Sequence, residues 1–252
     1  MQRNRDANMR RFADLHLRVP LKDQSQAEKM IWKASELGYS LVGIPFPPNA
    51  TREQINRIKH ICNDAKVDFA ARTNFSPRNS NELLHDLRRF RRKFEIIAVR
   101  CHTKDVARQA AKDRRVDLLQ FSVTNLRQRF FDEQEAELAS QALSSLEIEL
   151  APLLQLTSFS RVRLLSCLRR EVATAERAKV PITISSGATE EQLMRGPRDY
   201  AALTTLFDLP LPSALNALSE TPLITVERNR KKLSPDFVAP GIHVVGRKTG
   251  TE

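Results

Sequence analysis

The chain has 252 residues, of which 41% are hydrophobic, and this length and apolar content suit a globular α/β protein with a real core. No apolar run approaches the roughly 18–20 residues of a membrane span, and the polar residues 1–11 predict no signal peptide. Lys and Arg (41) outnumber Asp and Glu (30), which gives a net charge of +11. This excess favours a polyanionic partner, either nucleic acid or an anionic membrane surface, and the alternative is that the excess charge serves only solubility.

Short apolar runs alternate with longer amphipathic segments along most of the chain. Seven runs are predicted as strands: Phe12–His16, Ser40–Ile44, Val67–Ala71, Glu95–Val99, Val116–Phe121, Leu146–Leu150 and Pro181–Ser185. Runs that are apolar at nearly every position, such as Ile96–Val99, are typical of a parallel sheet that is covered on both faces.

Amphipathic helices are predicted between successive strands. They are expected at Gln26–Leu37, Thr51–Ala65, Asn79–Lys93, Thr103–Arg114 and Asp132–Leu143, and from Thr157 or Ser158 to Ala178. Gly38 directly follows the first helix, as a C-terminal glycine does, and Thr51 and Gln54 have the spacing of a capping box.

The regular succession of strand and helix predicts the fold class. Seven strands in one direction with right-handed crossovers favour an α/β TIM-like barrel of about seven parallel strands, with an open doubly wound sheet as the alternative. Residues 189–233 change to short helices interrupted by prolines, and we expect them to form a helical closing segment. Residues 234–252 are expected to be a tail, in which Ile242–Val245 is either an edge strand or extended. We therefore predict one domain over residues 1–252.

The end of the first predicted strand carries Asp14, His16 and Arg18 at alternate positions. An Asp-x-His-x-His strand end can bind a divalent metal, because alternate side chains project from one face. Here Arg18 replaces the second histidine and puts a permanent cation among the would-be ligands. We expect Asp14 and His16 to be structural, a buried carboxylate and a hydrogen-bonded imidazole that hold the first loop.

Basic residues follow most of the predicted strands, at the edge where parallel barrels place their active sites. The residues predicted to bind phosphates are Arg18, Arg72, Arg100, Lys104, Arg127, Arg129, Arg195 and Arg198. Only five histidines are present, and only His16 and His102 fall at strand ends, so we predict no metal site and no catalytic residue in this chain. A second basic run, Arg88–Lys93, ends a predicted helix and is either a solvated face or an RNA contact.

Cysteine and glycine content restrict the chemistry further. Three cysteines lie far apart in the sequence, which argues against a disulfide framework and predicts a reducing compartment. With seven glycines and no Gly-rich phosphate loop, a nucleotide-driven activity is not expected.

Two segments in this order resemble a known family. Residues 12–17 read Phe-Ala-Asp-Leu-His-Leu, and residues 195–203 read Arg-Gly-Pro-Arg-Asp-Tyr-Ala-Ala-Leu, followed by a helix with Ala214, Leu215 and Ala217 and by Glu-Arg-Asn-Arg at 227–230. Their order and separation resemble the archaeal and eukaryotic ribonuclease P protein component 3 family over essentially the full length. From its motif we carry over Arg195, Pro197 and Asp199 alone.

The resemblance implies a TIM-like barrel related to polymerase-and-histidinol-phosphatase hydrolases but without their metal site. It also implies a subunit of ribonuclease P, the endonuclease that removes the 5′ leader of precursor tRNA. In that particle the RNA carries the catalytic Mg²⁺, the protein binds no cofactor, and component 3 pairs with component 2. The location would be cytoplasmic in an archaeal cell or nuclear in a eukaryotic one. Pro197 and Asp199 would have local roles, Asp199 by capping a helix or bridging to Arg195 or Arg198.

Two other functions remain open from the sequence. One is a metal-dependent phosphoesterase that uses Asp14, His16 and His102, and the other is a free-standing module that binds RNA or a membrane surface. An obligate partner would also leave an exposed apolar patch, which residues 200–218 could supply, unless they close the barrel instead.

Overall fold

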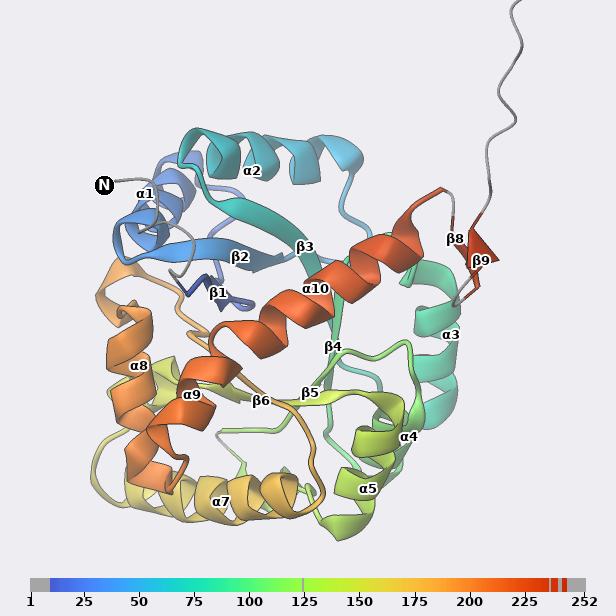
Figure 1. The fold of residues 1–252 in the computed structure, drawn as a ribbon, viewed down its shortest axis with the longest axis vertical. Coiled ribbons are helices and arrows are strands. Elements are labelled where there is room, and N and C mark those ends of the chain that lie inside the picture. The colour runs from blue at the N-terminus through green and yellow to red at the C-terminus, as the bar shows by residue number, and fades with distance from the viewer. Residues whose placement is uncertain (1–9, 124, 236, 240–241, 244–252) are drawn as a thin grey trace, which may run out of the picture.

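The computed structural model describes residues 10–123, 125–235, 237–239 and 242–243. Its centre is a sheet of seven parallel strands that follow one another in chain order (Figure 1). The strands are β1 (Phe12–Asp14), β2 (Tyr39–Pro45), β3 (Asp68–Phe75), β4 (Ile96–Arg100), β5 (Leu118–Gln120), β6 (Ser145–Glu149) and β7 (Ile182–Ser185). A doubly wound sheet would reverse its order at a switch point, so this sequential order identifies the predicted barrel.

The barrel closes between β1 and β7 without a regular ladder. Just beyond the two strands, Gly187 donates its backbone N–H to the carbonyl of His16, and Arg18 donates to the carbonyl of Ala188. Within β1 itself, the N–H of Ala13 donates to the carbonyl of Leu218. The barrel is therefore nearly closed. We call the end where the strands finish the mouth and the end where they begin the floor.

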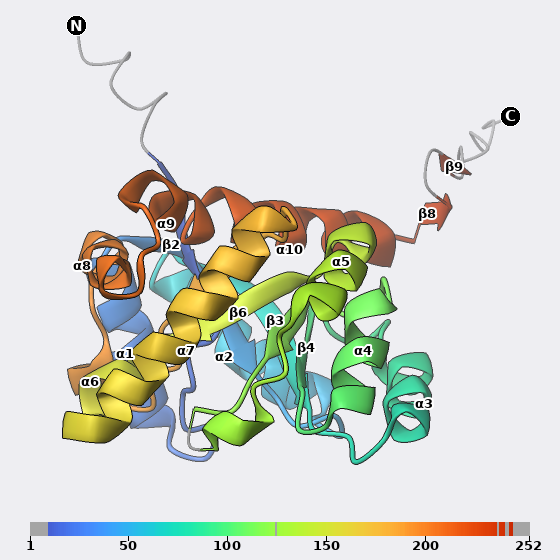
Figure 2. The ribbon, with the colours of Figure 1, turned by 90° about the horizontal axis from the view of Figure 1, so that it is seen from below.

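Helices surround the barrel on its outside (Figures 1 and 2). They are α1 (Gln24–Glu36), α2 (Arg52–Asp64), α3 (Ser80–Phe90), α4 (Lys104–Lys112), α5 (Glu133–Ala142), the short α6 (Ala151–Gln155) and α7 (Ser158–Arg177). Side-chain oxygens cap the first turns of α1 to α5, and the expected capping box of Thr51 and Gln54 is present. Gly38 follows α1 with φ +91°, a conformation that other residues rarely adopt. Among the described residues, no helix is both long and apolar enough for a membrane span.

Residues 189–233 wrap one side and the floor of the barrel. They form the short 3₁₀ helices η3 (Glu191–Leu193) and η4 (Thr204–Phe207) and the helices α8 (Pro197–Leu203), α9 (Leu211–Ala217) and α10 (Glu220–Leu233). Figure 1 shows α10 lying across the strands, and Figure 2 places it along the edge opposite the mouth loops. Val226 of α10 is fully buried in one cluster with barrel residues, including Ala13, Leu41 and Ile96. This helix therefore seals the floor.

Polar residues of α10 complete the seal. Asn229 donates one amide to the carbonyl of Glu95 at 2.8 Å and to the Asp117 carboxylate at 2.8 Å. Arg230 binds both oxygens of Asp68 at 2.7 and 2.9 Å and also the Glu95 carboxylate at 2.6 Å. These contacts join α10 to the first residue of β3, Asp68, and to Glu95 and Asp117, which directly precede β4 and β5.

The interior of the barrel is apolar near the floor and polar toward the mouth. The apolar layer consists of Ala13, Leu15, Leu41, Ala70, Ile96, Ala98 and Leu118. Gly43 allows β1 and β2 to approach closely here, because a Cβ atom at this position would lie 2.5 Å from the carbonyl oxygen of Leu15. The polar layer above it contains the candidate site.

The structure differs from the sequence-based expectations at several element boundaries. β3 continues to Phe75, four residues beyond the predicted end at Ala71, whereas β1 ends two residues early, at Asp14. Ile242–His243 (β9) pairs antiparallel with β8 (Phe237–Ala239) and not with the barrel, and Val245 lies outside the described residues.

The expected apolar patch of residues 200–218 is only partly exposed. Phe207 and Leu209 are buried in the main core, as barrel closure requires. Leu206 and Leu211 each remain about half exposed, at 46% and 47%. Closure therefore accounts for part of this apolar sequence and leaves two leucines at the surface.

Candidate functional site

The mouth of the barrel contains polar side chains from four of its strands. Because alternate residues of a strand face the interior, each strand contributes one or two of them. They are Arg72 and Asn74 on β3, Gln120 on β5, Glu147 and Glu149 on β6, and Ser185 on β7. His16 and Arg18, from the loop after β1, complete the set.

A fully buried ion pair forms the lower part of this layer. The Arg72 guanidinium binds the Glu147 carboxylate through two contacts of 2.6 Å, and both side chains are 0% exposed. Arg72 also donates to the carbonyl of Leu15 at 2.7 Å, and Ser185 donates to Glu147 at 2.6 Å. Burial raises the pKa of Glu147, but the charge and hydrogen bonds of Arg72 outweigh it and hold the pKa below its usual range.

The prediction that Arg72 binds phosphates is wrong. Its side chain lies inside the barrel and has no surface for an RNA contact. The reason is the extra length of β3, which carries Arg72 at an interior strand position instead of in the loop after the strand.

His16 connects the loop after β1 to the polar layer. Its ring is fully buried, with Nδ1 2.6 Å from Glu149 Oε1 and Nε2 3.0 Å from the Asn74 amide and 3.2 Å from Arg18 Nε. Since Glu149 accepts and Arg18 donates, this pattern assigns the proton to Nδ1 of a neutral ring. Burial lowers the pKa of His16, and the Arg72 charge lowers it further.

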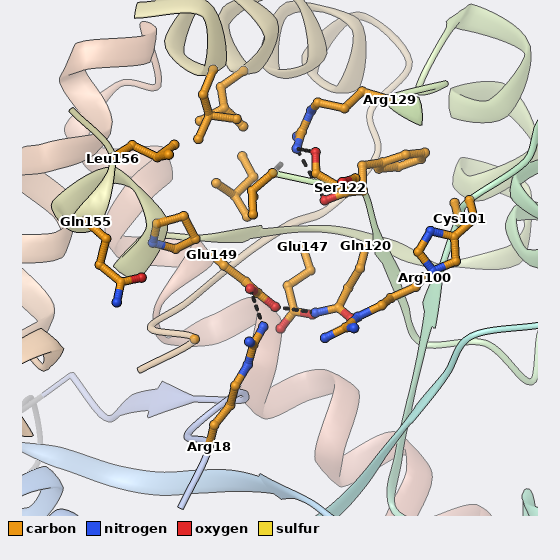
Figure 3. Close-up of a pocket in the computed structure, with 18 of the residues that line it drawn as sticks. Arg18, Arg100, Cys101, Gln120, Ser122, Arg129, Glu147, Glu149, Gln155 and Leu156 are labelled. Atoms are coloured by element: carbon orange, nitrogen blue, oxygen red, sulfur yellow. Dashed lines mark hydrogen bonds and ion pairs between the residues drawn. The ribbon is translucent and has the colours of Figure 1, made fainter. Parts of the chain in front are cut away.

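Glu149 is the carboxylate nearest to solvent in this layer, and Arg18 neutralises it. Arg18 Nη2 lies 2.5 Å from Glu149 Oε2, and Gln120 donates to Oε1 at 2.5 Å (Figure 3). Burial raises the pKa of Glu149, but His16 and then Arg18 favour the ionised form more strongly, so its pKa lies well below the usual range. Each of the two carboxylates of β6 thus has its own guanidinium.

His16, Glu147 and Glu149 are the one group of possible metal ligands found in the described part of the chain, with their ligand atoms within 4.8 Å of one another. All these ligand atoms already have partners: Glu147 binds Arg72 and Ser185, and Glu149 binds Arg18, Gln120 and His16. A metal ion would have to displace two guanidiniums, which cannot lose their charge. The donor set therefore does not fit a resident metal.

The ligand set of the phosphoesterase alternative is not assembled. Asp14 is 2% exposed and accepts hydrogen bonds from the backbone of His16 at 3.0 Å and of Ser186 at 2.9 Å, so it joins the loops after β1 and β7. His102 lies 2.8 Å from Ser76 at the surface and is not part of the group around His16. These contacts of Asp14 and His16 account for a structural role.

A cavity of about 390 Å³ opens above the polar layer at the mouth. Arg18, Arg100, Gln120, Glu149, Gln155 and Leu156 line it (Figure 3). Arg100 is exposed, so its guanidinium remains accessible from solvent. Buried Gln120 Oε1 has no hydrogen-bond partner among the described residues.

The remaining basic residues expected at the mouth differ in their surroundings. Arg129 turns inward: its side chain is 4% exposed, pairs with Glu171 of α7, and donates to the carbonyl of Phe121, so the prediction that it binds phosphates is wrong. Lys104 is about half exposed and pairs with Asp132 at 3.0 Å. Arg127 is exposed.

Arg195 and Arg198 are exposed, but they do not lie at the mouth as expected. Tyr39, the first residue of β2, donates its hydroxyl to the carbonyl of Arg195 at 3.1 Å, which places this segment toward the floor. Pro197 is the buried first residue of α8, and Asp199 accepts from the backbone N–H of Gly196 at 3.2 Å in a capping-box arrangement. Asp199 therefore caps its helix, and no bridge from it to either arginine occurs among the described residues.

The basic run Arg88–Lys93 is partly used in internal contacts. Arg91 donates to the carbonyl of Phe94 at 3.1 Å and lies 3.5 Å from Asp117, and Lys93 donates to the carbonyl of Pro48 at 2.7 Å. Arg89 stacks over the Phe90 ring at 5.0 Å.

Comparison with known proteins places this fold in a family. A family model described as RNase P subunit p30 matches residues 11–234. The chain belongs to this family. It is 26% identical over 235 residues to ribonuclease P protein component 3 of Methanococcoides burtonii, covering 93% of this chain and 94% of that protein. It is 29% identical over 157 residues to the same component of Methanosarcina mazei, covering 62% and 64% of the two chains.

Solved structures share the fold. A chain of archaeal ribonuclease P with mature tRNA, determined by cryo-EM, superposes with a TM-score of 0.79 at 20% identity and covers 94% of this chain and 100% of that one. The ochratoxinase of A. niger superposes with a TM-score of 0.56 at 11% identity, covering 86% and 71%. The predicted family is confirmed.

Sequence reasoning missed the two carboxylates at the mouth of this RNase P subunit. Glu147 and Glu149 lie within the predicted apolar strand Leu146–Leu150, and their alternation in Leu-Glu-Ile-Glu-Leu is a usable signal. Two acidic residues on one face of a buried strand need charged partners. The partner of Glu149 is Arg18, 131 residues earlier, and the partner of Glu147 is Arg72, 75 residues earlier. Pairs so far apart in the sequence cannot be found from local spacing.

Proposed function

We propose that this chain acts as the component 3 protein subunit of ribonuclease P, the ribonucleoprotein endonuclease that removes the leader of precursor tRNA. The observation that carries the proposal is the family match over residues 11–234, together with relatives named ribonuclease P protein component 3. In this role the protein binds and stabilises the RNA, and the RNA performs the cleavage.

The chemistry of the mouth supports a role without catalysis by the protein. Its acidic groups, Glu147 and Glu149, are each held by an arginine, and its histidine is buried and neutral. None of these groups is available to activate water or hold an ion. The Mg²⁺ that cleavage requires would be bound by the RNA, and the protein would bring no cofactor of its own.

The charge of the chain supports an RNA partner. Exposed arginines such as Arg100, Arg127, Arg195 and Arg198 can contact backbone phosphates and release condensed counterions. The excess of +11 lowers the repulsion between RNA helices held near one surface. Because these contacts are ionic, binding would weaken steeply as salt increases.

The partners we propose are the ribonuclease P RNA, protein component 2 and the other protein subunits, with precursor tRNA contacted indirectly and no membrane. We place the particle in the cytoplasm of an archaeal cell or the nucleus of a eukaryotic one. Leu206 and Leu211, each about half exposed, are available for a protein contact.

Reconstitution of the particle tests the proposal. Precursor-tRNA cleavage by the RNA with component 2 is measured at low Mg²⁺ with and without this chain, and with polylysine of equal total charge as the control. We expect the chain, but not polylysine, to raise the cleavage rate and to lower the Mg²⁺ requirement. A rate that does not depend on the chain would refute the proposed function.

A further inference from the structure

A cavity of about 240 Å³ lies on the outside of the barrel, between η2 (Leu126–Gln128) and the middle of α7. Its lining is Leu126, Arg127, Arg163, Ser166, Cys167 and Arg170. We call it the arginine pocket. It is separate from the cavity at the mouth. The two cavities share no described lining residue, although Leu164 and Leu168 of α7 also line the cavity at the mouth.

Helix geometry brings the cations of the arginine pocket together. Arg163, Ser166, Cys167 and Arg170 are spaced at i, i+3, i+4 and i+7, so they lie along one face of α7. Arg127 reaches the same cavity from η2, in the loop after β5. All three arginines are exposed at the protein surface.

Among the described residues, the arginines of this pocket are not directly paired with carboxylates, and only Arg170, together with Cys167, also lines the neighbouring groove that contains Asp132, Glu133 and Glu171. No acidic residue lines the pocket, and none of its three arginines makes an ion pair with a carboxylate in the described ranges. Three guanidiniums around one cavity repel one another, and an anion between them would remove that repulsion. Guanidinium groups match phosphate oxygens in geometry and charge.

Other arginines on α7 are in a different situation. Arg169 lies 3.3 Å from Asp208, Arg177 lies 3.2 Å from Glu133, and the neighbouring groove also contains the pairs of Lys104 and Arg129 with carboxylates. Arginines with and without a carboxylate partner are therefore interspersed along one helix, and the arginine pocket collects two that have none in the described part of the chain, Arg163 and Arg170.

An exposed aromatic ring continues the same face of α7. Phe159 is 72% exposed, four residues before Arg163, whose guanidinium lies 5.7 Å from the centre of the ring. Exposed aromatic rings beside cationic grooves bind single-stranded or looped RNA by stacking on its bases. Arginines beside an exposed ring match the two chemical parts of an unpaired RNA segment, its phosphates and its bases, so the combination favours RNA.

We infer that the arginine pocket binds backbone phosphates of an unpaired RNA segment, and that Phe159 stacks on one of its bases. The inference rests on the proposed function, since it names the surface through which the subunit contacts RNA. It assigns to Arg163, Arg170 and Phe159 a role that the sequence alone did not suggest.

Paired substitutions on α7 test the pocket. Affinity for ribonuclease P RNA is measured with the full chain and component 2 over a series of salt concentrations, for R163A/R170A and for the control R169A/R177A. Both variants remove two positive charges from the same helix, but only the first removes arginines that lack a carboxylate partner among the described residues. We expect R163A/R170A to bind roughly tenfold more weakly and to reduce the slope of log K against log salt by about 2. The control should change the affinity less than about twofold, because its cations are already paired.

The aromatic ring is tested in the same assay. F159A should lower the affinity and leave the salt slope unchanged, because stacking involves no counterion release. An unchanged affinity for F159A would refute the stacking contact. Equal losses in R163A/R170A and R169A/R177A would refute the pocket and leave only the total charge as the cause.

Cys167 provides a second readout that requires no substitution of the cysteine itself. It is partly exposed in the lining of the pocket, whereas Cys62 and Cys101 are buried, and burial raises the pKa of the Cys62 thiol to about 12 and that of Cys101 higher still. Iodoacetamide should therefore react mainly with Cys167. We expect RNA to slow this reaction in the wild-type chain and not in R163A/R170A. Equal rates with and without RNA would overturn the inference.

The outcomes separate the inference from the proposed function. If the wild-type chain supports cleavage and binds RNA, but R163A/R170A binds as tightly as the wild type, the pocket is refuted and the function stands. If R163A/R170A loses component 2 and not RNA, the pocket is a protein contact and the inference is again refuted. If the wild-type chain neither binds RNA nor supports cleavage, the proposed function itself fails.

Discussion

Arg18 and Arg72 give the mouth of this barrel its chemical character. Each guanidinium lies within 2.6 Å of a carboxylate on β6, so two fixed cations occupy the region where the three possible metal ligands converge. Unlike a metal ion, these cations cannot be exchanged or removed by a chelator. They leave a rigid polar layer that holds four strands and the loop after β1 together.

Substitution of Arg72 should destabilise the protein strongly. R72A leaves the Glu147 carboxylate buried without its partner, which we expect to cost about 3–5 kcal/mol in the free energy of unfolding. R72M/E147L, which removes both charges and keeps similar volume, should recover much of this loss. Urea denaturation measures all three proteins, with the exposed R127A as a control that changes stability by less than about 0.5 kcal/mol. Equal effects of R72A and R127A would contradict the buried pair.

His16 should make stability depend on pH. Its ring faces Arg18, Arg72, Glu147 and Glu149, and its pKa in the folded protein is lowered from 6.5, chiefly by burial. The unfolded chain therefore binds the proton more readily, so the contribution of His16 is present above about pH 6.5 and is lost as the pH falls below it. The advantage of the wild type over H16Q should shrink by up to about 1.4 kcal/mol per pH unit between about pH 6.5 and 5. Urea denaturation at several pH values measures it, and an advantage that does not change with pH would show that the ring is not titrating.

At the scale of single residues, the sequence identifies the polar residues after β1 but not their partners on β3 and β6. Asp14, His16 and Arg18 are found because they are neighbours at alternate positions of one strand end. The prediction places Arg72 in a loop because the polar residues Arg72, Thr73 and Asn74 follow an apolar run, whereas in the structure they continue β3. Glu147 and Glu149 are missed because their partners are remote in the chain.

Helix α10 closes the floor of the barrel and separates its apolar interior from solvent. It covers the floor with Val226 and, through Asn229 and Arg230, binds the start of β3 and the residues just before β4 and β5. The sequence predicted a helical segment here from its composition, but not its position. Asn229 and Arg230 are polar residues that α10 uses for contacts with the barrel. From the sequence alone, such residues are indistinguishable from the solvent-exposed face of a helix.

Asn229 is the residue through which this seal can be tested. N229A removes hydrogen bonds to the Glu95 carbonyl and to Asp117, so we expect a loss of about 1–3 kcal/mol in the free energy of unfolding. I224A is the matched control, because Ile224 lies on the same helix and is 55% exposed, and it should change stability by less than about 0.5 kcal/mol. Similar urea midpoints for N229A and I224A would mean that the hydrogen bonds of Asn229 do not stabilise the packing of α10 on the floor.

Strands and outer helices were the most predictable elements. Near-continuous apolar runs such as Ile96–Val99 exist because both faces of the barrel wall are covered, and the caps at Thr51 and Asp132 are local signals. Element ends were less predictable, as at β3, because tertiary contacts and not local sequence decide where a strand stops.

For the whole molecule, the compensated mouth has a consequence for metal dependence. We expect EDTA to leave the melting temperature of the isolated chain unchanged, because the ligand atoms of His16, Glu147 and Glu149 are bound to protein groups. Differential scanning calorimetry with elemental analysis of the purified chain measures this. One tightly held zinc, manganese or iron ion per chain, lost together with stability in EDTA, would restore the phosphoesterase alternative.

The order of synthesis adds a constraint that follows from the contacts of β1. β1 and the residues just after it, which precede the other barrel strands in the chain, obtain their last partners from Gly187, Ala188 and Leu218 and their apolar cover from Val226. At about 5–20 residues per second, these residues emerge roughly 10–40 s after β1. Throughout that interval β1 and β7 are not joined, and the apolar floor of the nascent barrel is exposed. Chaperone binding and proteolysis should therefore be most effective in this period, before α10 leaves the exit tunnel.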